Sequence, residues 1–191
     1  MKKAIILLIL LFPSCAVVKQ PALQPFAGAE DWMVRMPLEY EIGDSGQVIS
    51  VPNGFVTDFA SVPPKLRPFF PKLGKYLQAA IVHDYLYWNQ TCSRDQADKI
   101  FYHAMKESHV ETIDKFLFYQ AVDKFGEKAW MENSKHKAAG LIKVVPGELL
   151  KVDPELTWKE YRIELKKRGV NDADPYIDPS KKCQVISRYV D

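Results

Sequence analysis

Residues 79–88 read Ala-Ala-Ile-Val-His-Asp-Tyr-Leu-Tyr-Trp, an apolar run that holds one adjacent pair of ionisable side chains, His83 and Asp84. The pattern predicts a helix from about Leu73 to Trp88. His83 and Tyr87 are four residues apart and share one face of that helix, whereas Asp84 lies about 100° around it. Polar groups gathered inside an apolar helix make this stretch the first candidate for a functional site.

A second helix is expected from about Ser93 to Glu107. Ser93 is a good N-cap, and the charge of Asp95 in the first turn favours the helix dipole. The short connection predicts that the two helices pack antiparallel. Asp95 and Asp98 share one face of the second helix, so either carboxylate, Asp98 more readily, is placed to reach the ring of His83.

A carboxylate beside an imidazole suits general-base chemistry, because the carboxylate fixes the tautomer of the ring and stabilises its protonated form. We therefore predict a hydrogen bond of about 2.6–3.2 Å between His83 and Asp98. The alternative is a satisfied buried pair with a structural role, in which Asp84 caps another loop and Tyr87 fills the core.

A third helix is expected from about Val110 to Met131. Its apolar residues lie on one face and its charges on the other, which predicts that the apolar stripe packs into the core rather than lining a cofactor site. The residues at helical spacing are Ile113, Phe116, Leu117, Gln120, Ala121 and Lys124.

Strand patterns precede the helices. Residues 32–36 alternate weakly between apolar and polar side chains, and residues 38–42 alternate clearly. A turn at 43–46 leads into residues 47–51, which completes a β-hairpin, and residues 55–59 form a further short strand. The chain is therefore expected to be α+β and mainly α, with an N-terminal β-hairpin packed on a core of about three helices and an irregular C-terminal arm.

The N-terminus has the features of an export signal. A basic start is followed by an apolar run from Ala4 to Phe12, which is shorter than the roughly 20 residues of a membrane-spanning helix. The pair Ser14-Cys15 resembles the end of a bacterial lipobox, which implies lipidation of Cys15, and Ala16 after it points to the outer membrane. The expected location is the bacterial cell envelope, with the membrane as partner through a lipid anchor. Ordinary cleavage nearby or a retained anchor remains open.

The expected organisation is a signal peptide over 1–14, a tether over 15–30, a core domain over 31–140 and a C-terminal arm over 141–191. The arm contains one short amphipathic helix from about Trp158 to Arg168. Two cysteines lie beyond Cys15, and an oxidising compartment would allow Cys92 and Cys183 to pair. Two separate thiols are the alternative.

Charge and motifs exclude several functions. The chain has 26 Lys and Arg against 24 Asp and Glu, for a net charge of +2, so no one-signed field is available to hold a nucleic acid. The sequence has no Gly-rich phosphate loop and no Gly-x-Ser-x-Gly elbow. His103, His109 and His136 show no ligand spacing, which argues against a structural zinc site.

Three blocks of sequence, residues 53–63, 80–87 and 97–105, resemble a small phage and prophage family of unassigned function. That resemblance spans roughly residues 30 to 130 and implies a phage or prophage origin. The string from His83 to Tyr87 is also similar to the His-Asp-x-x-Tyr helix of secreted and parvoviral phospholipase A2 enzymes. The similarity includes the small residues before the string and an Asp on the following helix.

The resemblance to phospholipase A2 implies a role for each matching residue. His83 would be the base that activates a water for attack on an ester, and Asp98 with Tyr87 would orient it. Asp84 would be a calcium ligand. Those enzymes bind calcium with carbonyls of a Gly-rich loop that this chain lacks, so Asp58 is the expected substitute ligand. Alternatively, Asp58 only closes its own turn.

Two hypotheses follow from the sequence. One is a calcium-assisted lipid esterase that acts on phospholipid. The other is a non-catalytic, phage-encoded envelope lipoprotein that acts by binding, for instance in the exclusion of a competing phage or in modification of the host surface. The sequence does not name a protein partner.

Overall fold

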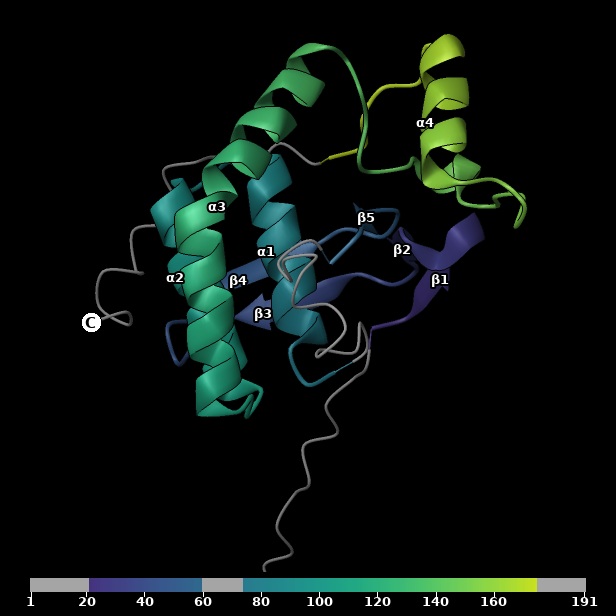
Figure 1. The fold of residues 1–191 in the computed structure, drawn as a ribbon. Coiled ribbons are helices and arrows are strands. Elements are labelled where there is room, and N and C mark those ends of the chain that lie inside the picture. The colour runs from purple at the N-terminus through teal and green to yellow at the C-terminus, as the bar shows by residue number, and fades with distance from the viewer. Residues whose placement is uncertain (1–20, 60–73, 175–191) are drawn as a thin grey trace, which may run out of the picture.

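The computed structural model describes residues 21–59 and 74–174, and Figure 1 shows how their elements are arranged. Three helices, α1 (Leu77–Asn89), α2 (Arg94–Glu107) and α3 (Thr112–Ala138), pack together. Small antiparallel sheets precede them, and a fourth helix, α4 (Trp158–Lys167), lies apart from the bundle near β1 and β2 (Figure 1). The predicted class, α+β and mainly α, is confirmed.

The strands form two separate sheets. β3 (Leu38–Glu41) and β4 (Val48–Val51) make the predicted hairpin, in which Leu38 pairs with Val51. The second sheet has the order β1-β2-β5, from β1 (Leu23–Pro25), β2 (Trp32–Val34) and β5 (Val56–Thr57). β2 is therefore a neighbour of β1 and β5 rather than part of the hairpin.

The first described residues correct the predicted tether. Residues 15–30 were expected to be irregular, but Leu23–Pro25 is a strand that pairs with β2, and the side chain of Phe26 is buried. The prediction failed because a three-residue strand is too short to show an alternating pattern. The tether and signal segments up to residue 20, including Cys15, lie outside the described residues.

The centre of the core is α1. Every residue of this helix except Gln78 is buried, the polar side chains of His83, Asp84 and Asn89 included. The helix is surrounded by α2, α3, β4 and β5, which explains why no face of it is left for solvent. A helix buried on all sides can hold polar groups only if they are hydrogen-bonded, so its polar residues decide where a site can form.

The third helix corrects a prediction about the core. The apolar stripe was expected to pack inward, but Ile113, Phe116 and Leu117 are 74%, 59% and 39% exposed. Ala121 of the predicted stripe is buried, but the other buried residues of α3 are Phe118, Val122 and Gly126, which the stripe did not include. On this buried face Phe118 packs against Tyr76 and Phe101, and Gly126 lets α3 approach Tyr87 of α1, so contacts with neighbouring elements orient the helix. The helix also ends at Ala138, beyond the expected Met131.

The C-terminal region is more ordered than the predicted arm. A second hydrophobic cluster contains Phe26, Met33 and Val56 from the N-terminal part of the chain. Its C-terminal members include Ile142, Val145, Trp158, Tyr161 and Leu165. The expected helix is present as α4, and Thr157 caps it in a capping box with Glu160. Residues 143–145 also bond to the sheet edge, since the amide of Val56 donates to the carbonyl of Lys143 and that of Val145 to Gly54. No helix of the described residues is long and apolar enough to span a membrane.

Candidate active site between α1 and α2

The connection between α1 and α2 brings their polar residues together. Gln90, in a left-handed conformation, is the C-cap of α1, and Ser93, three residues later, is the N-cap of α2. The Ser93 hydroxyl accepts from the amide of Gln96, and the Gln96 side chain accepts from the amide of Ser93. This capping box satisfies the first amides of α2 and fixes the point from which the helix runs back along α1.

Asp98 lies one turn into α2, opposite His83. The predicted hydrogen bond is present, with 2.8 Å between Nε2 of His83 and Oδ1 of Asp98. Both side chains are 3% exposed. Of the two carboxylates that the sequence left open, Asp95 faces solvent and pairs with Lys99 on its own helix. The partner of the imidazole is therefore Asp98.

Two further donors satisfy the Asp98 carboxylate. The Tyr87 hydroxyl donates to Oδ1 at 2.6 Å, and Nη1 of Arg94 donates to Oδ2 at 2.8 Å. Three donors, one of them cationic, thus bond the two oxygens of this buried carboxylate. Burial and the neighbouring Asp98 raise the pKa of Tyr87, so that its hydroxyl stays protonated and able to donate.

This geometry fixes the tautomer of His83. An ionised carboxylate can only accept, so the bond to Asp98 requires the hydrogen of the neutral imidazole on Nε2. The lone pair then lies on Nδ1, the atom that would take up a proton. The ring is also held by aromatic neighbours, with ring centroids of Tyr87 and Phe101 at 4.2 and 4.7 Å from its own.

Asp84 faces a different wall, as its position 100° from His83 predicts. Its Oδ2 accepts from the hydroxyl of Thr57 at 2.5 Å, and that hydroxyl accepts in turn from the amide of Phe59. Burial raises the pKa of Asp84, and the charge of nearby Asp58 raises it further, while Lys143 acts in the opposite direction. A bound cation would stabilise the charged form of the Asp84 carboxylate in this environment.

The donors around Asp84 fit calcium in kind. The carboxylates of Asp84 and Asp58 and the hydroxyl of Thr57 are the hard oxygen ligands that calcium prefers. Calcium takes six to eight such ligands, and the described residues contain no group of three or more His, Cys, Asp or Glu side chains able to hold a metal ion. Asp58 remains the expected second carboxylate, since it lies close enough to Asp84 to act on its pKa.

Two site residues were missed from the sequence. Arg94 precedes Asp98 by four residues, a spacing typical of helical ion pairs, and that signal was sufficient to find it. Thr57 lies next to Asp58 on β5, but a hydroxyl that bonds a carboxylate on a distant helix leaves no pattern in a single sequence. Cys92 is buried and disulfide-bonded, while Cys183 lies outside the described residues, so their pairing stays a prediction.

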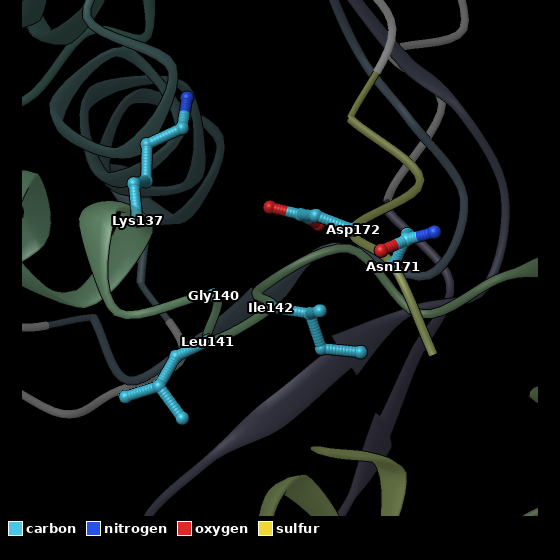
Figure 2. A pocket seen from close by; sticks show the side chains of 6 residues that line it. All are labelled: Lys137, Gly140, Leu141, Ile142, Asn171 and Asp172. Carbon is cyan, nitrogen blue, oxygen red and sulfur yellow. The ribbon is translucent and has the colours of Figure 1, made fainter. Parts of the chain in front are cut away.

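A separate small pocket lies between the end of α3 and the C-terminal segment. Its volume is about 110 Å³, and Figure 2 shows Lys137 from α3 on one side and Asn171 and Asp172 from the C-terminal segment on the other. The same segment bonds to α1, because the indole of Trp88 donates to Asp172 and the hydroxyl of Tyr85 donates to Asp174. These contacts hold the face of α1 that points away from Asp98.

The comparison with known families matches the part of the chain that holds these residues. Residues 32–122 match the family described as Protein of unknown function (DUF1353). This DUF1353 segment, just under half of the chain, contains the whole α1–α2 site and β5. It does not include α4 or the second hydrophobic cluster's C-terminal members.

The chain is also similar in part to an individual protein. It is the "Uncharacterized protein y4iH" of Sinorhizobium fredii (strain NBRC 101917 / NGR234), which is 34% identical over 74 residues, or 38% of this chain. The match spans about a third of the length of that relative. No solved structure matches the chain significantly.

Proposed function

We propose that the chain is a lipid esterase of the phospholipase A2 type, with His83 as its general base. The observation that carries this proposal is the bond from Nε2 of His83 to Asp98, because it leaves the lone pair on Nδ1. The resemblance of the His83–Tyr87 string to the phospholipase helix supports the assignment. So does the second bond to Asp98, from the Tyr87 hydroxyl.

The proposed reaction is the hydrolysis of an ester by water. Nδ1 of His83 takes a proton from the water as its oxygen attacks the ester carbonyl carbon, and Asp98 stabilises the imidazolium that forms. The same proton then passes to the departing alcohol oxygen, which leaves a fatty acid and a lysophospholipid. Asp84 and Asp58 would hold calcium, whose positive charge would stabilise the oxyanion.

The experiment measures fatty acid release from phospholipid vesicles, with calcium and with a chelator. We expect weak, calcium-dependent release that His83→Gln and Asp84→Asn abolish while the circular dichroism spectrum stays unchanged. The matched control is His136→Gln, because His136 lies on the last turn of α3 and is not part of the Asp98 cluster. Asp98→Asn should keep the fold and lose much of the rate, since the orienting charge is gone.

A second function is favoured by the burial of the site. Side chains of His83 and Asp98 that are only 3% exposed are also what a satisfied structural pair requires. On this alternative the chain is a non-catalytic, phage-encoded lipoprotein that acts by binding. Wild-type protein that binds no calcium and releases no fatty acid, and whose biological effect survives His83→Gln, would favour it over the esterase.

Both functions include attachment to the bacterial envelope. We propose that Cys15 is lipidated and that the mature chain is held at the outer membrane. Cys15→Ala should then move the protein out of the membrane fraction and prevent incorporation of labelled fatty acid. A variant that stays in the membrane fraction, with no lipid label on the wild type, would contradict the lipoprotein assignment.

A further inference from the structure

Two of the three described donors to Asp98, Arg94 and Tyr87, contact the backbone of α3. Nη1 of Arg94, which donates to Asp98, also lies 3.3 Å from the carbonyl oxygens of Val122 and Asp123. This nitrogen has two hydrogens, so one is directed at the carboxylate and the other is shared by the two carbonyls. The position of α3 therefore fixes where the guanidinium can lie.

The second donor, Tyr87, is seated on α3 at Gly126. A Cβ atom at Gly126 would overlap the Tyr87 hydroxyl oxygen and lie 3.2 Å from Cζ of the ring. The ring also packs edge-on against Trp130, four residues further along the same helix, with centroids 5.2 Å apart. A glycine weakens a helix interior relative to alanine, so its presence in the middle of α3 needs a local reason. The space that it leaves is occupied by the hydroxyl that donates to Asp98.

We propose that α3 is the positioning element of the His83–Asp98 pair, with Gly126 and Arg94 as the positioning residues. Gly126 admits the hydroxyl to one carboxylate oxygen, and Arg94 links the other oxygen to the α3 carbonyls. With both oxygens held, the carboxylate plane cannot rotate, and the imidazole follows it. The consequence for catalysis rests on the proposed esterase function, whereas the orientation of the pair does not.

The test uses the full chain and a proton signal that comes from the His83–Asp98 hydrogen bond itself. A hydrogen shared by Nε2 of His83 and Asp98 gives a far-downfield proton resonance in water, which His83→Gln identifies by its loss. We expect Gly126→Ala to shift or broaden this resonance in the folded protein. Gly147→Ala is the matched control, because nothing lies within 4 Å of a Cβ at that position and its backbone is unstrained. A resonance unchanged in Gly126→Ala would overturn the proposal.

A double-mutant comparison separates positioning from simple loss of packing. Tyr87→Phe removes the hydroxyl with which the new methyl group collides. Adding Gly126→Ala to Tyr87→Phe should therefore change the resonance much less than adding it to the wild type. Equal changes in both backgrounds would mean that Gly126 acts on the helix and not on the hydroxyl, which would also overturn the proposal.

Arg94 provides an independent test if Gly126→Ala does not fold. Arg94→Gln removes the charge and the forked donor, and Arg94→Lys keeps the charge alone. We expect a large shift of the His83 resonance in the first variant and a smaller one in the second. Wild-type signals in both variants would exclude Arg94 as a positioning residue.

Activity assays distinguish the failure of this proposal from the failure of the esterase. With active wild-type protein, Gly126→Ala should lower kcat roughly fivefold at unchanged KM, the loss expected for one weakened hydrogen bond. A shifted resonance in protein without any esterase activity would contradict the esterase and leave the positioning role in place. An active Gly126→Ala variant with a wild-type resonance would contradict only the positioning role.

Discussion

The helices α1 and α3 place polar and apolar side chains in opposite ways. α1 buries His83 and Asp84 together with its apolar residues, whereas α3 exposes Ile113 and Phe116 to solvent. Each helix is positioned by its neighbours rather than by its own hydrophobicity: α1 is enclosed by helices and sheets, and α3 touches the bundle along one narrow face. In this fold, polar residues within an apolar helix correctly predicted the contact between His83 and Asp98. The apolar stripe of α3 did not correctly predict the core.

Two phenylalanines on α3 test this contrast most strongly. Phe118 is fully buried and packs against Tyr76, with ring centroids 4.9 Å apart, whereas Phe116 is 59% exposed. Phe118→Ala should lower the free energy of unfolding by about 3–5 kcal/mol because it leaves a cavity. Phe116→Ala should change it by no more than about 0.5 kcal/mol. Urea denaturation of both variants measures the difference in unfolding free energy. Similar midpoints for the two variants would contradict the exposure of Phe116 on the outer face of α3.

Two aspartates on α2 test the polar side of the contrast. Asp98→Ala leaves the buried donors of His83 and Tyr87, and the Arg94 guanidinium, without their acceptor, so we expect a loss of about 3 kcal/mol in unfolding free energy. Asp95→Ala, one turn earlier and facing solvent, should cost about 0.5 kcal/mol or less. A cost for Asp98→Ala as small as that for Asp95→Ala would show that water replaces the carboxylate.

The capping boxes provide the smallest effect and refine the comparison. Ser93 caps α2 beside the main core, and Thr157 caps α4 in the second cluster, each with the same pair of reciprocal bonds. Ser93→Ala and Thr157→Ala should each cost about 1 kcal/mol, because the cap acts locally whatever the helix packs against. Thermal unfolding of the two variants measures this, and a much larger cost for Ser93→Ala would show that its cap also holds the site.

The sequence predicted those features that depend on local chemistry. The Ser93 cap, the hairpin at 38–51 and the partner of His83 are set by residues within about one helix or one turn of one another, and all three are present. What it missed depends on contacts between distant segments. The inward face of α3 depends on contacts such as that of Gly126 with Tyr87 and that of Phe118 with Tyr76, and β1 forms by pairing with β2.

The bonds between residues 143–145 and the edge of β5 have a consequence for the order in which the chain folds. Phe55 forms a β-bridge with Val144, which lies almost ninety residues later in the chain. The segment from β2 to β5 is therefore synthesised well before residues 143–145, which pair with it. Contacts of such separation form slowly, and until they form, the edge of β5 has unpaired amides and carbonyls. During synthesis the nascent chain therefore has an unpaired strand edge that is covered only when residues 143–145 emerge.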